Sequence, residues 1–236
     1  MKRSIFDIKT EEEYVKYKNK VDINEVDNAG QSALFYFDYG INFDKSEWLI
    51  KHGIDIHMLN KYNQNSLFYS NYDKARLLIS NGININQIDS SGESPLFRAV
   101  ASSDEKISQL LIENQADINI VNRCGENALF YSSFKASSIL IANGININQL
   151  DNRGNNALVN IDDNQLDHVD KAKLLIEMGI DLEIVKREPL KMKMIGSDKV
   201  RSLVMVRLAI NEKKIIDREI KDETSVGSDT GKRKRL

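Results

Sequence analysis

The sequence is poor in the residues that build disulfides, metal centres and membrane spans. It has one cysteine, Cys124, two prolines and three histidines among 236 residues. A single cysteine excludes an internal disulfide and a multi-cysteine zinc site, which is typical of a reducing compartment. Met1 to Thr10 lacks the apolar core of a secretory signal, and no hydrophobic run approaches the length of a membrane span. We therefore expect a cytoplasmic protein without a membrane segment.

Residue patterns typical of catalysis are also missing. His52, His57 and His168 have no partners at the spacing of a metal or nucleophile site, and Cys124 lacks a base. No glycine-rich loop of the phosphate-binding kind is present. The chain has 35 Asp and Glu residues, so a neighbouring pair of acids does not specifically indicate a catalytic site. We expect no enzymatic activity, no cofactor and no metal.

What the sequence does contain is a repeat. A leucine recurs at spacings of 33, 29, 33 and 29 residues, followed after 32 more by a weaker copy; the series is Leu34, Leu67, Leu96, Leu129, Leu158 and Leu190. Periods of this size are typical of stacked repeats, in which each unit covers the apolar face of its neighbour.

Each copy carries the chemistry of two helices and a projecting loop. A Ser or Asn stands two residues before each strong leucine and predicts the start of a first helix, as Ser94 does. An apolar triplet such as Leu77-Leu-Ile predicts the buried stripe of a second helix, and Gly82 predicts its end. Ile83-Asn-Ile-Asn then reads as an extended arm, and Asp89-Ser-Ser-Gly92 as a tight turn.

The segment Ser94-Pro-Leu-Phe-Arg-Ala99 resembles the T-P-L-H-x-A motif of ankyrin repeats, and five copies agree over roughly residues 10 to 210. The resemblance implies an all-α ankyrin-repeat solenoid of helix-turn-helix pairs with projecting β-hairpin loops. There are three departures. Gln115 replaces a usual glycine, and Asn63 replaces the turn glycine. The motif histidine is replaced throughout, by Phe35, Phe68, Phe97, Phe130 and Val159.

We divide the chain into four parts on this basis. Residues 1–26 are a half repeat that caps one end, and residues 27–185 are five repeats that alternate between long and short. Residues 186–221 are a degenerate sixth repeat or C-terminal cap, and 222–236 are a disordered basic tail. The short copies lack four residues, about one helical turn, so we expect clipped first helices in the second and fourth copies. Such alternation predicts a pocketed inner wall.

Charge is distributed unevenly along the chain. Residues 1–185 contain 18 basic and 27 acidic residues, whereas 186–221 contain 11 basic and five acidic ones. An acidic repeat body favours a basic protein partner and makes nucleic acid unlikely there. Two alternatives stay open. The C-terminal segment can carry the activity of a secreted effector, or the basic end with Lys232 to Arg235 can bind nucleic acid or another polyanion.

The resemblance implies a binding protein that uses its concave face. We expect the protein to be a stoichiometric inhibitor, or an immunity or anti-defence factor, and to be a monomer when free. One equivalent position in four successive copies is occupied by Tyr36, Tyr69, Arg98 and Tyr131, which should form a stripe. The same position also suits packing between repeats. Candidates at the loop tips are Tyr62, Glu93, Arg123, Glu126 and Arg153. Candidates on the first helices are Tyr36, Asp38, Tyr39, Tyr69, Tyr72, Arg98, Tyr131 and Phe134.

Overall fold

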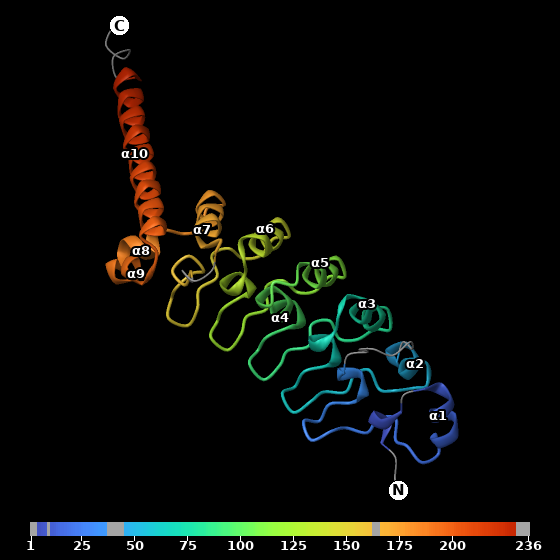
Figure 1. Ribbon diagram of the computed structural model, residues 1–236. Coiled ribbons are helices and arrows are strands. Elements are labelled where there is room, and N and C mark those ends of the chain that lie inside the picture. The colour runs from blue at the N-terminus through green and yellow to red at the C-terminus, as the bar shows by residue number, and fades with distance from the viewer. Residues whose placement is uncertain (1–3, 9, 37–44, 162–165, 230–236) are drawn as a thin grey trace.

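The protein is a row of helical units from which loops project to one side (Figure 1). The computed structural model describes residues 4–8, 10–36, 45–161 and 166–229, and side chains as far as 219. The α-helices of the row are α2 (Lys45–Lys51), α3 (Tyr72–Ser80), α4 (Pro95–Ala101), α5 (Glu105–Glu113), α6 (Phe134–Ala142) and α7 (His168–Glu177). Short 3-10 helices η2 (Ala33–Phe35), η3 (Ser66–Tyr69) and η4 (Ala128–Tyr131) complete the units. The described residues form no β-strand, only isolated bridges such as Val26–Ser32.

Side chains at the predicted positions start most of the first helices. The Asn65 and Asn127 side chains each accept a hydrogen bond from the amide two residues on, at 3.2 Å, and Ser94 accepts one from Phe97 at 3.2 Å. Each bond satisfies an amide that has no partner inside its helix. Ser32 differs, because its hydroxyl makes no capping bond at the start of η2.

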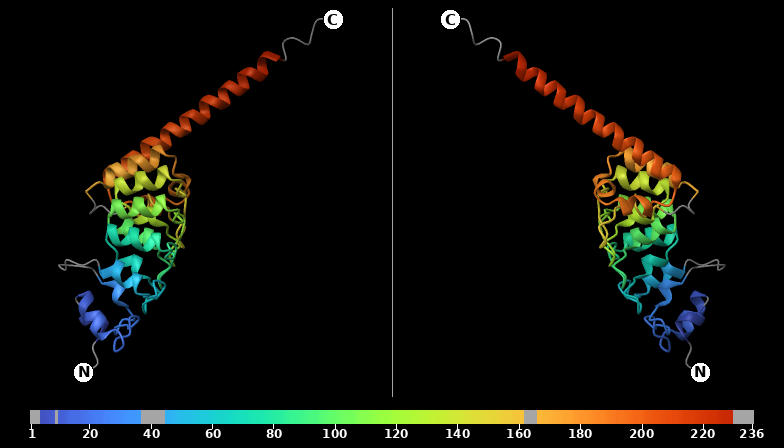
Figure 2. Two further views of the ribbon diagram at one scale, coloured as in Figure 1. Left: turned by 90° about the vertical axis from the view of Figure 1, so that its right-hand side faces the viewer. Right: turned by 90° about the vertical axis from the view of Figure 1, so that its left-hand side faces the viewer.

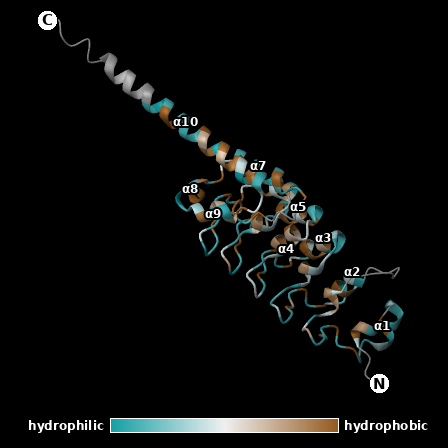
Figure 3. Cartoon of the chain, turned by 60° about the vertical axis from the view of Figure 1, so that its left-hand side comes forward, coloured by the Kyte–Doolittle hydropathy of each residue, from teal (hydrophilic) through white to brown (hydrophobic). Residues whose placement is uncertain are grey.

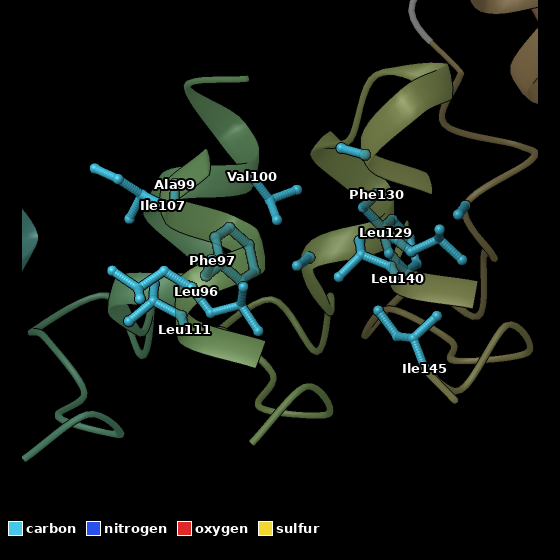
Figure 4. Close-up of a cluster of buried hydrophobic side chains, with 14 of the residues drawn as sticks. Leu96, Phe97, Ala99, Val100, Ile107, Leu111, Leu129, Phe130, Leu140 and Ile145 are labelled. Atoms are coloured by element: carbon cyan, nitrogen blue, oxygen red, sulfur yellow. The ribbon is translucent and has the colours of Figure 1, made fainter. Parts of the chain in front are cut away.

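One apolar column runs through all the units. The five strong repeat leucines are at most 3% exposed, and the central leucines of the second helices, for example Leu78 and Leu111, are 0% exposed. Figure 4 shows these side chains converging between the helices of successive units. Burial of a leucine stabilises by about 1.5–3 kcal/mol, so the column supplies the main folding energy.

The first helices differ in length. The second and fourth copies have only the single turns η3 and η4, whereas α4 in the third copy is a seven-residue α-helix. The first copy departs from the expectation of a long helix, because η2 ends at Phe35 and residues 37–44 lie outside the described part. In the fifth copy, residues 157–160 form a turn.

Hydrogen bonds tie each projecting loop to the one before it. Within a loop, one Asp or Asn side chain accepts two amides, as Asp89 does from Ser91 at 2.8 Å and Glu93 at 3.0 Å. Between loops, the Ser90 amide donates to the carbonyl of Tyr62 at 2.8 Å, and three further loop pairs repeat this bond. The loops therefore form a continuous edge rather than independent tips.

The arms add a second ladder, which explains the Ile-Asn alternation. The isoleucines turn inward, so Ile83 and Ile145 are buried at 5% and 6% exposure. The Asn86 side chain accepts the amide of Asp117 in the next unit at 2.8 Å, and Asn119 and Asn148 do the same one and two units on.

Gln115 and Asn63, which replace glycines of the repeat, have the backbone conformation expected of glycine. Gln115 has φ 64° and Asn63 has φ 62°, in the left-handed region, where the homologous helix-ending Gly144 has φ 84°. For a residue with a side chain this conformation costs roughly 1–2 kcal/mol, less for Asn. Gln115 is therefore a strained position.

We expect Gln115→Gly to raise the free energy of unfolding by about 0.5–1 kcal/mol, because glycine removes that strain but loses more chain entropy on folding. Urea denaturation measures the change. Gly144→Ala is the matched control and should lose about 1–2 kcal/mol; an added Cβ there meets nothing within 4 Å, so only backbone strain is introduced. An unchanged midpoint in both variants would contradict the strain argument.

The two ends of the row differ from its repeats. At the N-terminus lie η1 (Ile5–Asp7) and α1 (Glu11–Tyr17), and Thr10 caps α1 by accepting the Glu13 amide at 3.2 Å. At the C-terminus lie α8 (Glu183–Arg187), α9 (Pro189–Met194) and α10 (Asp198–Asp229). The Lys191 ammonium of α9 donates to the carbonyl of Gly154 at 2.6 Å, so it satisfies an acceptor of the last loop.

Helix α10 corrects the expectation of a disordered tail from residue 222. It packs on α7 at its start and continues as helix through Asp229, well beyond the row (Figures 1 and 2). Residues 230–236, which include Lys232 to Arg235, lie outside the described part. Apolar residues occur along α10 as far as residue 219 (Figure 3), and Val206 and Ile216 are 59% and 54% exposed.

Two lysines are buried inside the row. Lys74 of α3 donates to the carbonyl of Tyr36 at 2.8 Å, and Lys171 of α7 donates to the carbonyl of Ser132 at 2.7 Å. Their exposed fractions are 4% and 1%. Both come from the first turn of a second helix and reach back to the end of the short first helix of the preceding unit. Burial lowers the pKa of Lys171 to about 8, against the opposing effect of Asp167.

The depressed pKa of Lys171 predicts a pH-dependent stability. Between about pH 8 and 10.5 the unfolded chain keeps a proton on Lys171 that the folded chain has released, so stability rises with pH across this window. We expect the wild type to gain roughly 2–3 kcal/mol relative to Lys171→Met over that range. Urea denaturation of both proteins at several pH values tests this, and parallel pH profiles would refute it.

Candidate binding surface

The surface predicted to bind a partner is formed by the loops and the first helices. In Figure 1 the loops project to one side of the row, while α3, α5, α6 and α7 line the opposite side. We call the loop side the inner surface. Equivalent positions two residues after each repeat leucine form its central row, which we call the inner row: Tyr36, Tyr69, Arg98, Tyr131 and Asn160.

The tyrosines of the inner row are held at both ends of their side chains. The Tyr69 hydroxyl donates to Gln64 Oε1 at 2.6 Å, and the Tyr131 hydroxyl donates to Glu126 Oε2 at 2.6 Å. Their rings pack against phenylalanines of the preceding units, with centroids 5.7 Å from Phe35 and 5.2 Å from Phe97 respectively. Packing between repeats is therefore part of their role, yet Tyr131 stays 41% exposed.

These hydrogen bonds, together with burial, shift the pKa values of the inner row and of acids near it. Burial raises the pKa of Tyr131 to about 12, with a further contribution from its hydrogen bond to Glu126. The Tyr36 hydroxyl donates to the carboxylate of Asp27, and this bond lowers the pKa of Asp27. Burial and the neighbouring Asp89 raise the pKa of Glu93, while Arg98 opposes them. At neutral pH Tyr36 and Tyr131 are therefore uncharged.

Spectroscopic titration tests this arrangement. In the difference between wild type and Tyr131→Phe, the ultraviolet absorbance of the missing tyrosine should titrate with a pKa of about 12. In Glu126→Gln the same difference should titrate at lower pH, because the carboxylate that disfavours the phenolate is gone. A Tyr131 that titrates alike with and without Glu126 would show that the two groups do not interact.

The remaining candidates fall into three groups. Tyr62, Arg123 and Arg153 are exposed at the loop tips, and Tyr62 is 58% exposed. Tyr72 and Phe134, expected on first helices, are instead the first residues of the second helices α3 and α6, because the clipped first helices end two or more residues earlier.

Two candidates cannot be placed. Asp38 and Tyr39 lie outside the described residues.

The step between a short and a long first helix leaves a hollow. It lies between η3 and α4 and has a volume of about 260 Å³. Its walls combine apolar groups with three hydroxyls and two charged groups. The lining residues are Leu67, Phe68, Tyr69, Ser70, Pro95, Arg98, Ala99, Ser102, Asp104 and Ile107.

Larger hollows lie on other sides of the row. Two of them, of about 450 and 550 Å³, adjoin along α3 and α5 and share Asp73 and Leu110. A third, of about 430 Å³, separates α7 from α10 and is lined largely by aliphatic groups, including Val169 and Leu203. None of the three involves the inner row.

The inner surface combines tyrosine hydroxyls with amide and carboxylate groups. Within the described residues, no group of three or more His, Cys, Asp or Glu side chains is placed to hold a metal ion. No described helix is both long and apolar enough to cross a membrane. Cys124 is an exposed free thiol at a loop tip.

Sequence reasoning missed the buried lysines and the hydroxyl partners of the tyrosines. The signal for the lysines was present, since Lys74 and Lys171 both stand three residues before an apolar triplet of a second helix. The helical period places that position on the buried side. For the tyrosines the signal was a repeated spacing, since Gln64 stands five residues before Tyr69 and Glu126 five residues before Tyr131.

Comparison with known proteins agrees with this architecture. Residues 42–122, which contain α2 to α5, match the family model described as ankyrin repeats in three copies. No curated protein matches the sequence. Ankyrin repeats are protein-interaction modules and are typically not enzymes. Residues 42–122 are therefore ankyrin repeats, and the leucine column and the tied loops continue on both sides of them.

Proposed function

We propose that the protein is a non-catalytic binding protein that holds a protein partner on its inner surface and acts as a stoichiometric inhibitor, of the immunity or anti-defence kind, in the cytoplasm. The observation that carries the proposal is the inner row. Its tyrosines are exposed in part and fixed by hydrogen bonds, as in Tyr131 with Glu126 at 2.6 Å.

A fixed aromatic row suits protein recognition for a physical reason. Tyrosine and arginine often dominate binding energy at interfaces because they bring a large contact area and a polar end. Ordering a side chain on binding costs roughly 0.5–1.5 kcal/mol, and the row has met that cost in advance. Such a surface can bind tightly without changing shape.

The charge balance favours a basic partner. Residues 1–185 carry an excess of nine acidic residues, which would steer a cationic protein toward the repeats. The loop tips are locally different, since Lys61, Arg123 and Arg153 are exposed there. We therefore expect the basic groups of the partner to contact the first helices rather than the tips.

Inhibition follows from occupancy. A partner held by a rigid surface without reactive groups is retained and not consumed, so one chain neutralises one partner molecule. We expect the free chain to be a monomer and the complex to contain one copy of each protein.

The test begins with affinity capture from a lysate of the source organism, identification of the retained protein and its purification. Isothermal titration should give a 1:1 complex, and Tyr131→Ala should weaken it at least tenfold, since interface tyrosines commonly contribute more than about 1.4 kcal/mol. Tyr72 was a candidate contact, but it begins α3 on the side opposite the loops. Tyr72→Ala is therefore the matched control and should bind as the wild type does. Thermal melts establish that both variants are folded.

Two results would refute the proposal. One is that no protein is retained specifically. The other is that the retained protein binds wild type and folded Tyr131→Ala equally well.

A further inference from the structure

Each of three short first helices is approached by the second helix of the next unit, and in two of the three cases a lysine makes the contact. At η2 the contact comes from Lys74 of α3, whose ammonium donates to the carbonyl of Tyr36 at 2.8 Å. At η4 the contact comes from Lys171 of α7, which donates to the carbonyls of Ser132 at 2.7 Å and Phe130 at 3.4 Å. The chain thus uses an ammonium to satisfy carbonyl groups that a clipped helix leaves without a partner.

The third contact lacks its lysine. At η3 the equivalent residue is Ile107 of α5, whose side chain has no hydrogen-bond donor. The carbonyl groups that correspond to those bound by Lys74 and Lys171 belong to Phe68, Tyr69 and Ser70, and they accept no hydrogen bond within the described part of the chain. All three residues and Ile107 line the hollow of about 260 Å³.

The hollow has the features that a lysine side chain requires. Leu67, Pro95 and Ala99 offer apolar walls for the methylene stem. Asp104 adds a carboxylate; one of its oxygens accepts the Ile107 amide at 3.0 Å and caps α5. A charge-assisted hydrogen bond to a carbonyl or a carboxylate is stronger than a neutral one.

One group opposes a cation. Arg98 is exposed, lines the hollow and makes no hydrogen bond through its side chain within the described residues. Its charge acts on Glu93, whose pKa it lowers against the effects of burial and Asp89. Arg98 is therefore expected to limit affinity, and its long side chain can turn away from an incoming ammonium.

We propose that the hollow between η3 and α4 is an acceptor site for a primary ammonium group, namely a lysine side chain of the bound protein. The partner's lysine takes the place that Lys74 and Lys171 take at the other two short helices. This inference rests on the proposed function, because the hollow is part of the inner surface. It specifies the basic character of the partner as one inserted residue.

The test uses a probe in place of the partner. N-acetyl-lysine methylamide is titrated into the isotope-labelled full chain at neutral pH and followed by amide chemical shifts. N-acetyl-norleucine methylamide, with a similar stem and no ammonium, is the matched control. We expect the lysine probe alone to shift resonances of Ser70, Asp104 and Ile107, with a dissociation constant of about 1–10 mM, as suits so small a ligand.

Three variants locate the ammonium. Ile107→Lys should abolish probe binding, because the chain then fills the hollow as Lys74 does, while Ile107→Leu should retain it. Asp104→Asn keeps a side-chain cap for α5 but removes the charge, so binding should weaken about three- to tenfold. Arg98→Gln should strengthen binding by a similar factor, which a purely apolar pocket would not show.

The inference is overturned if neither probe shifts these resonances, if both do so equally, or if Ile107→Lys binds as the wild type does. These outcomes are separate from those for the proposed function. A captured partner that binds folded Ile107→Lys unchanged would remove the lysine site and leave the binding function standing, whereas failure to capture a partner leaves the probe measurement valid.

Discussion

The structure depends on the covering of each repeat by the next. A single helix pair has an apolar side that it cannot bury alone, and the leucine column shows how stacking solves this problem without a closed globule. Every other regularity follows from keeping the repeats at a fixed spacing. The loops must be long enough to reach their neighbours, and the arms must place isoleucine inward and asparagine outward.

Fixed spacing also explains why variation appears only at certain places. The buried leucines are nearly invariant from copy to copy, whereas the first helices differ in length and the inner row contains Tyr, Arg and Asn. A short first helix exposes backbone carbonyls to the interior, and the chain must find donors for them. Buried lysines are one answer, and their low exposure shows that backbone oxygens stabilise a charge that burial would otherwise disfavour.

Much of this architecture could be predicted from the sequence. The leucine spacing gives the number of units, and four missing residues predict the single turns η3 and η4. Gln115 and Asn63 could be assigned positive φ because glycine stands at the equivalent positions of other copies. Each of these inferences compares one copy with another, so the repeat itself supplies the reference.

Features without a repeated counterpart could not be predicted in this way. Tyr72 and Phe134 were placed on the wrong helices because the end of a 3-10 turn leaves little trace in an apolar pattern. Helix α10 was cut short at residue 221, since the scarcity of apolar residues from Asp222 onward suggests a disordered tail, whereas the helix continues through Asp229.

Helix α10 sets the geometry of whatever is joined to the protein at that end. Its 32 residues span about 48 Å at 1.5 Å per residue, much of it clear of the row (Figure 1). A flexible linker of the same length would let its far end wander in all directions. A continuous helix acts instead as a strut, so a fused fluorophore or affinity handle would be held at a defined distance, clear of the surface that receives the partner.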